Sequence, residues 1–272
     1  MKTKVVSLVV AGALSVCVVR DALPQEDYRS ADPDRPIKIE DAYPLKLYEW
    51  EWQMGTRAEV AQGGAYDASL LLELKAGFAR NWQAGIEAHG AWARAAGSST
   101  TGLEEIAGHL LFNLNQESVA VPALSVRGDL FVSGAGDLAR EDLGGRLKGI
   151  ATTSVGRTRL HANLAHAWAS SADGDDVWSG GVGFDYPLGL FSKAILGDVY
   201  IEIPTTGGSR VWAELGGRLQ LTNTYVLDAG LTTRLDEWAD GRSNIGLVLG
   251  MSRVFGIAGL VKVPPYPEPT LR

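Results

Sequence analysis

The chain has a single cysteine, Cys17, no basic excess and little overall hydrophobicity. One cysteine excludes an intrachain disulfide. A nucleic-acid-binding protein is expected to carry a basic face, and a formal net charge of −7 argues against such a partner. The mean hydropathy is +0.00, whereas a protein of membrane-spanning helices would be far more apolar. These absences leave one large domain whose apolar residues are spread along the sequence.

The N-terminal segment has the pattern of an export signal. Lys2 and Lys4 precede an apolar stretch from Val5 to Val19, which is shorter than the roughly 20 residues of a spanning helix. This pattern predicts a Sec signal peptide over residues 1–22; a lipoprotein box ending at Cys17 and a retained anchor are the alternatives. Residues 23–43 are polar and rich in proline and aspartate, so we expect a flexible periplasmic lead-in there.

The remainder repeats one unit in which apolar residues alternate with polar or very small ones. Between residues 68 and 78, for example, Leu70, Leu72 and Leu74 alternate with Glu73 and Lys75. Twelve such stretches follow one another, and the alternation is weakest near Arg146–Val155. The pattern predicts an all-β fold over residues 44–255, a single antiparallel up-and-down transmembrane β-barrel of about 12 strands. Both termini would be periplasmic, and residues 256–272 would form an extended C-terminal tail.

Connection lengths and aromatic residues support the same topology. Short turns are expected at 79–81, 116–118, 156–158, 187–189 and 221–224, and longer loops at 95–102, 133–145, 169–176, 204–209 and 236–242. Aromatic residues gather beside these connections, as they do at membrane interfaces. We expect the interface aromatics to be Trp82, Trp92, Trp168, Trp178, Tyr186, Phe191, Tyr225 and Phe255. A soluble sandwich or lipocalin-like barrel is the alternative, and its apolar side chains would point inward.

Residues for catalysis or metal binding are not evident. None of the four histidines, His89, His109, His161 and His166, begins the His–Ser pattern of barrel acylhydrolases. Cysteine and histidine spacings typical of metal sites, a phosphate-binding loop and a dinucleotide fingerprint are all missing. We therefore expect no enzyme, no catalytic residue, no metal and no cofactor. His89, His109 and His161 are expected to line the interior, and His166 to lie at the membrane interface.

The polar positions of the later stretches carry many charges, which inside a barrel must be paired or hydrated. They would form either a cross-strand ladder that fills the interior or a pore lining that sets selectivity, and the two interpretations are compatible. The candidate lining residues are Arg127, Asp129, Asp198, Glu202, Arg210, Glu214, Arg218, Asp228 and Arg234. Glycines such as Gly216 and Gly230 are expected to relieve curvature or to allow close approach of large neighbours.

Several short segments resemble a known family. They are RPIKIEDAYPL from Arg35, NLNQE from Asn113, PALSV from Pro122, GDVY from Gly197 and LDAGL from Leu227. These segments are similar to outer-membrane proteins of the MetA-pathway of phenol degradation family. The resemblance implies a barrel that takes up aromatic or other apolar compounds without energy input. The sequence after residue 130 reads FVSG in place of the expected Pro-Thr-Gly.

We therefore expect an outer-membrane channel for passive diffusion of small, aromatic or hydrophobic compounds through a barrel lined by charged residues. The protein would arrive in the outer membrane of a Gram-negative envelope after Sec-dependent export. Its partners would be outer-membrane lipid and lipopolysaccharide, a small-molecule solute and the barrel-assembly machinery. A structural or loop-displaying barrel with a plugged lumen and no transport is the alternative. An outer-membrane hydrolase is a third class, disfavoured by the missing nucleophile pattern.

Overall fold

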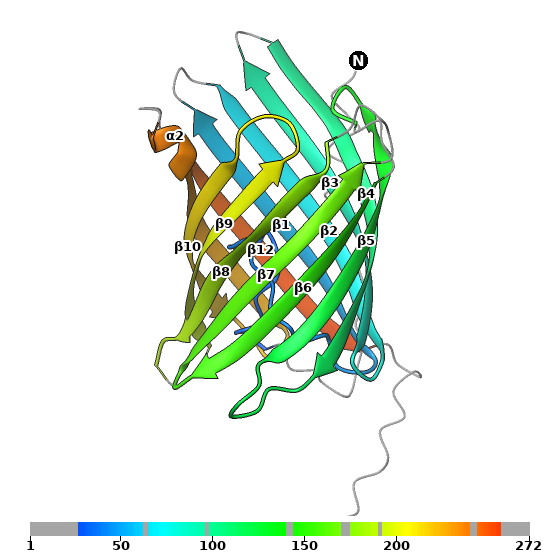
Figure 1. Ribbon diagram of the computed structural model, residues 1–272, viewed down its shortest axis with the longest axis vertical. Helices are drawn as coiled ribbons and strands as arrows, with labels where there is room; N and C mark the ends of the chain where they lie inside the picture. Colours follow the sequence, from blue (N-terminus) through cyan, green and yellow to red (C-terminus); the bar gives the residue numbers. More distant parts are fainter. Residues whose placement is uncertain are drawn as a thin grey trace, which may run out of the picture.

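The structure, a computed structural model, describes residues 27–61, 65–95, 98–139, 144–169, 175–189, 192–239 and 244–256. Within them, twelve strands form a closed antiparallel barrel in which each strand pairs with its neighbours in sequence and β1 pairs with β12 (Figure 1). The strands are β1 (Glu49–Ala61), β2 (Tyr66–Ala79), β3 (Trp82–Ala95), β4 (Ser98–Asn115), β5 (Ala123–Gly136), β6 (Gly144–Val155), β7 (Thr158–Ala169), β8 (Val177–Pro187), β9 (Lys193–Pro204), β10 (Arg210–Gln220), β11 (Tyr225–Arg234) and β12 (Asn244–Gly256). The predicted twelve-stranded up-and-down barrel is confirmed.

The alternating pattern sorts side chains between two faces of the wall. The side chains of Leu70, Leu110 and Leu247 are 37%, 50% and 47% exposed on the outside, whereas Arg218 and Asp228 are buried inside. Successive residues of a strand point to opposite faces, so one parity must face outward along each strand. This arrangement is the reverse of a soluble barrel, whose apolar parity would fill the interior.

The strands extend further than the sequence patterns indicate. The predicted loop at 95–102 is mostly strand, because β3 continues to Ala95 and β4 begins at Ser98, a Ser/Thr-rich stretch compatible with strand geometry. The predicted turn at 116–118 is part of a longer connection in which Ser118 N donates to Val121 O.

A short helix, α2 (Leu235–Ala239), follows β11 at the end of the barrel that carries the longer loops. It is held by Asp236, whose Oδ1 accepts a 2.9 Å hydrogen bond from Val211 N, and by an ion pair of 3.0 Å between Arg234 and Glu237. Among the described residues, no helix is long and apolar enough to cross a membrane.

Residues 27–47, which we call the plug, lie inside the barrel near the end with the short turns (Figure 1, blue). Ile37 and Ile39 are fully buried against Leu196 of β9. Ala42 is buried in a second apolar cluster with Leu111. The sequence predicts a flexible lead-in at residues 23–43, but the described part of it is enclosed, because its apolar side chains and backbone amides find partners on the wall. The predicted signal peptide (1–22) and the tail beyond Gly256 lie outside the described residues.

Candidate functional site

The plug is fixed to the wall by its own backbone amides. Lys38 N and Ile39 N both donate to Asp198 Oδ2, at 2.8 and 3.0 Å. Further along, Glu40 N donates to Asn163 Oδ1, Ala42 N to Thr152 Oγ1 and Leu45 N to Gln83 Oε1. The acceptors belong to β9, β7, β6 and β3, so the plug crosses the lumen. Because a buried amide without a partner is costly, these polar wall residues fix the path of the plug.

One buried ion cluster, which we call the Arg35 cluster, holds the first half of the plug. Arg35 is fully buried, and its guanidinium lies 2.9 Å from Asp32, 3.8 Å from Glu51 and 3.5 Å from Asp228. Lys75 pairs with Asp32 and Glu51, and Arg218 pairs with Asp228 and Asp32. The cluster thus contains three cations and three carboxylates, and such mutual pairing is the condition for keeping charges out of water.

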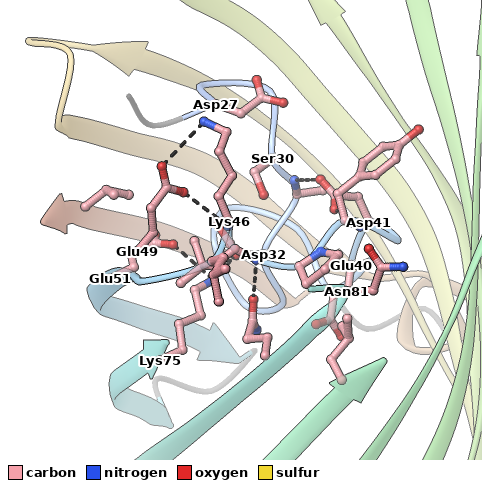
Figure 2. Close-up of a pocket in the computed structure, with 18 of the residues that line it drawn as sticks. Asp27, Ser30, Asp32, Glu40, Asp41, Lys46, Glu49, Glu51, Lys75 and Asn81 are labelled. Carbon is pink, nitrogen blue, oxygen red and sulfur yellow. Dashed lines mark hydrogen bonds and ion pairs between the residues drawn. The ribbon is translucent and has the colours of Figure 1, made fainter. Parts of the chain in front are cut away.

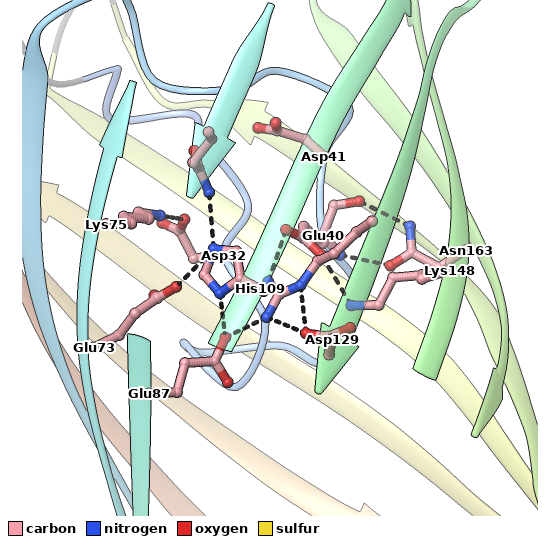
Figure 3. Close-up of polar contacts among 12 residues, drawn as sticks. Asp32, Glu40, Asp41, Glu73, Lys75, Glu87, His109, Asp129, Lys148 and Asn163 are labelled. Carbon is pink, nitrogen blue, oxygen red and sulfur yellow. Dashed lines mark hydrogen bonds and ion pairs between the residues drawn. The ribbon is translucent and has the colours of Figure 1, made fainter. Parts of the chain in front are cut away.

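A second cluster, the Arg127 cluster, holds the other half (Figure 3). Arg127 of β5 contacts Glu40 of the plug at 3.1 Å, Asp129 at 2.8 Å and Glu87 of β3. Lys148 lies 2.8 Å from Glu40, and Arg146 lies 3.0 Å from Asp129. Burial alone would raise the pKa of Glu40, but Arg127 and Lys148 outweigh it and lower that pKa. This cluster also contains three cations and three carboxylates.

Asp41 has a different environment from Glu40. Its carboxylate accepts hydrogen bonds from Ala31 N and Tyr43 N, each 2.9 Å long, and so closes a turn within the plug. Burial raises the pKa of Asp41 to about 6, although Arg159 and His161 lower it. The carboxyl group therefore changes charge within a mildly acidic range.

Two facing glycines make room for the plug. Gly216 of β10 pairs with Gly230 of β11, and Pro36 lies over both of them. A Cβ atom on Gly216 would lie 2.5 Å from Pro36 Cγ, and one on Gly230 would lie 2.9 Å from Pro36 Cβ. Real Cβ atoms do not approach this closely, so these positions must lack a side chain while the plug is docked.

A cavity of about 430 Å³ lies at the short-turn end between the plug and the wall (Figure 2). Its lining is mixed and strongly charged, with Asp32, Asp41 and Lys46 from the plug and Glu51 and Lys75 from the wall. A space of this size and polarity suits water and small polar solutes.

The candidate lining residues fall into two groups. Six are buried inside the barrel: Arg127, Asp129, Asp198, Glu214, Arg218 and Asp228. The other three lie toward the long-loop end, where Arg210 pairs with Glu202 at 3.6 Å and is 53% exposed, and Arg234 pairs with Asp236 and Glu237. The structure therefore brings Arg127, Asp198, Arg218 and Asp228 into contact with the plug, pairs Asp129 and Glu214 with arginines of the wall, and leaves Glu202, Arg210 and Arg234 near the rim.

The interface aromatics lie at the ends of strands. Trp82, Trp92, Trp168, Trp178 and Tyr186 are between 36% and 51% exposed on the outer face. Tyr225 begins β11, and Phe255, near the end of β12, stacks on Trp50 with ring centroids 6.5 Å apart. Phe191 lies outside the described residues.

The histidines lie on the faces of the wall that their sequence parity indicates. His161 is buried between Thr152 and Asp185, with both contacts at 3.1 Å. His109 and the half-buried His89 both contact Glu87. His166 contacts the ring of Trp178 in a tilted arrangement at a centroid distance of 4.5 Å and lies 3.6 Å from Asp176.

Sequence reasoning missed the plug as part of the site. The available signal was the alternation of Ile37 and Ile39 with Lys38 and Glu40, a strand-like pattern within a segment otherwise rich in proline and aspartate. A short alternation of this kind indicates two-sided contact, but it does not identify the surfaces that the segment contacts.

The barrel is similar to solved structures at low sequence identity. The COG4313 outer membrane channel from Pseudomonas putida F1 matches with a TM-score of 0.57 and 12% identity, over 83% of this chain and 100% of that chain. A NanC porin structure matches with a TM-score of 0.51 and 12% identity, over 74% and 98%. The KdgM porin in complex with disordered oligogalacturonate matches with a TM-score of 0.50 and 13% identity, over 75% and 99%. No protein-family model matches the chain, and no curated protein matches it. The likeness shows the fold, which is that of outer-membrane β-barrels.

Proposed function

We propose that this chain is an outer-membrane channel for small solutes whose lumen is closed by its own plug. Both termini would lie on the periplasmic side, since the plug enters β1 at the short-turn end and short turns face the periplasm in such barrels. Export would use the Sec signal predicted at residues 1–22. The outer face would contact lipid and lipopolysaccharide after insertion by the barrel-assembly machinery.

This proposal rests on the contrast between the apolar outer face of the wall and the charged side chains inside the barrel. Leucines such as Leu164 and Leu231 are more than half exposed on the outer face, while buried charges fill the inside. β1 and β12 pair along their whole length, from Glu49 with Gly256 to Ala61 with Asn244. The wall is therefore closed without the plug. Because mainly ion pairs and hydrogen bonds to side chains hold the plug, it can leave without breaking the inter-strand ladder.

The lumen favours polar or charged passage over apolar passage. The guanidinium groups of Arg35 and Arg127 form ion pairs with carboxylates across the lumen, and charged groups contribute to the lining of the cavity beside the plug. Membership of the MetA-pathway of phenol degradation family, and uptake of aromatic or hydrophobic compounds, remain proposals that rest on the sequence resemblance.

The test is conductance of the purified protein in a planar lipid bilayer, followed by swelling of proteoliposomes in neutral and charged solutes of similar size. We expect discrete conductance steps and faster swelling than in protein-free liposomes. Charge-reversing changes at Asp198 and Glu214 should alter the ratio of charged to neutral flux, while the yield of inserted protein stays the same.

A structural or loop-displaying barrel without transport is the second candidate, and the balanced pairing in the Arg35 and Arg127 clusters favours it. In that case the protein would insert into the bilayer but produce neither conductance steps nor swelling. Removing the plug residues would then be the only way to obtain flux.

A further inference from the structure

Glu73 is a buried carboxylate that belongs to neither ion cluster. The Arg35 cluster and the Arg127 cluster each hold three cations and three carboxylates, and neither includes an ion pair to Glu73. Glu73 lies on β2 with its side chain 3% exposed. In the part of the chain that the structure describes, its one polar contact is with His109 Nε2, at 3.6 Å. A buried carboxylate with so little compensation either takes up a proton or binds a cation.

The protonation of His109 follows from its neighbours. Gln83 Oε1 accepts a hydrogen bond from Leu45 N, so the amide nitrogen of Gln83 is turned toward His109 Nε2, at 3.4 Å. An amide N–H can only donate, and Nε2 therefore presents its lone pair. The other ring nitrogen, Nδ1, faces Glu87 Oε1 at 3.0 Å, where a proton on the ring is favoured. In this tautomer no hydrogen atom lies between Nε2 and the Glu73 carboxylate, and a cation that binds Nε2 takes the place of the Gln83 N–H.

The gap between these two groups has the size of a metal site. Zn²⁺ binds imidazole nitrogen and carboxylate oxygen at about 2.0–2.2 Å, which places two tetrahedral ligands about 3.4 Å apart. The observed separation of Glu73 Oε1 and His109 Nε2 is 3.6 Å. One ligand atom each from Glu73, Glu87 and His109 lie within 4.8 Å of one another, and these residues occupy the adjacent strands β2, β3 and β4 (Figure 3).

The surroundings of His109 also match those of a metal-binding histidine. Such histidines commonly give their second ring N–H to a carboxylate, which fixes the tautomer and the orientation of the ring. Glu87 takes this position and is itself held by Arg127. The ring lies over Gly85 of β3, where a Cβ atom would lie 2.3 Å from His109 Cε1. The imidazole ring of His109 can therefore occupy this position only because Gly85 has no side chain.

We propose that Glu73 and His109 bind one divalent transition-metal cation of the zinc class inside the barrel, with Glu87 orienting His109. The bound cation neutralises Glu73 and lies between its carboxylate and His109 Nε2. Water completes the coordination from the lumen. The alternative occupant of the gap is a proton shared between Glu73 and His109.

The experiment uses the full-length folded barrel in detergent micelles after removal of metals by chelation. Titration with Co²⁺, followed by its visible absorption, and with Zn²⁺, followed by calorimetry, should reveal one site per chain. Glu73→Gln and His109→Gln should each weaken binding by about tenfold or more. His166→Gln is the matched control, because that histidine lies outside the cluster, and it should bind as the unmodified protein does.

Heat-modifiable electrophoretic mobility reports whether each variant is folded. Glu73→Gln preserves shape and removes only charge, so it remains informative if His109→Gln fails to fold. X-ray absorption of the zinc-loaded unmodified protein should show one imidazole and oxygen ligands. The absence of stoichiometric binding, a spectrum without imidazole, or unchanged affinity in folded Glu73→Gln would each overturn the metal site and leave the shared proton.

Discussion

At the scale of single residues, the missing side chains of Gly216 and Gly230 allow the plug to dock. A methyl group at Gly216 would collide with Pro36, whereas one at Gly128 of β5 would meet no atom within 4 Å. We predict that Gly216→Ala destabilises the docked plug by about 1–3 kcal/mol, as overpacking of a tight contact does. Trypsin cleavage after Lys38, followed by mass spectrometry, should then rise by about fivefold or more.

Gly128→Ala is the control for that change, since it adds the same methyl group to another strand. It should leave cleavage after Lys38 at the level of the unmodified protein. Equal cleavage of the two variants would mean that Gly216 is not a docking position.

Asp41 gives the plug a specific dependence on pH. Because the pKa of its carboxyl is raised to about 6 from 3.8, the folded state favours the protonated form. Its contribution to stability is complete below about pH 4 and is lost as the pH rises through 6. Each pKa unit corresponds to about 1.4 kcal/mol, so the loss is on the order of 3 kcal/mol.

Asp41→Asn isolates this effect, because Glu40 and Asp32 titrate in both proteins and cancel in the comparison. Between pH 4 and pH 7, the unfolding midpoint of the unmodified barrel should fall relative to that of the variant. The midpoints would be measured by loss of the folded electrophoretic band on heating. Parallel pH profiles would contradict the raised pKa.

At the scale of elements, the sequence predicts the strands well and the plug poorly. An alternation such as Leu70, Leu72 and Leu74 is local and repeats the period of a strand, so the wall follows from neighbouring residues alone. The buried position of Arg35 depends instead on Glu51 and Asp228, and the latter lies almost 200 residues away in the sequence. Partners this distant leave no periodic signal near Arg35. The proline and aspartate content of the segment therefore resembles that of an exposed linker.

The sequence predicts which residues face the interior, but it does not predict that they contact the plug. Arg127, Asp198 and Arg218 have the polar parity of interior residues, and the structure places them inside. Their contacts, however, are largely to the plug and to other charged wall residues, which parity cannot indicate. The Glu73 and His109 pair escaped detection for a similar reason, because strands bring together residues whose spacing matches no metal motif.

Arg35→Met tests whether the plug is held by charge. This change leaves Asp32, Glu51 and Asp228 with one cation fewer, and breaking a buried ion cluster costs about 3–5 kcal/mol. We expect cleavage after Lys38 to begin at a lower urea concentration than in the unmodified protein.

Arg210→Met is the comparison, because the side chain of Arg210 is 53% exposed and, among the described residues, its ion pair is with Glu202 at 3.6 Å. An exposed pair of this kind contributes at most about 1 kcal/mol. If the two substitutions moved the urea dependence equally, burial of Arg35 would not be what secures the plug.

At the scale of the whole molecule, the proposed position in a membrane requires an outer face that suits lipid. Leu164 of β7 is 63% exposed on the wall, and an arginine in the middle of a lipid-facing strand costs about 2–4 kcal/mol. We predict that Leu164→Arg lowers the yield of protein folded into vesicles. Leu188→Arg, at a position 40% exposed in a turn, should fold normally. A soluble barrel would tolerate both changes equally.

At the same scale, the proposed function requires that residues 27–47 close a pore which the wall alone would leave open. Ala42 of the plug and Ala123 of β5 belong to one buried cluster, so we choose these two positions for an engineered disulfide. A matched pair within the wall is Ala151→Cys with Ala162→Cys, which face each other across β6 and β7. Mass spectrometry confirms each bond.

The most direct measurement is the swelling rate of proteoliposomes that contain the Ala42→Cys and Ala123→Cys protein, first oxidised and then reduced. We predict slow swelling with the disulfide closed, recovery on reduction, and no redox effect in the wall pair. Swelling that is fast and unchanged with the plug locked would show that solutes bypass residues 27–47 and would contradict the account.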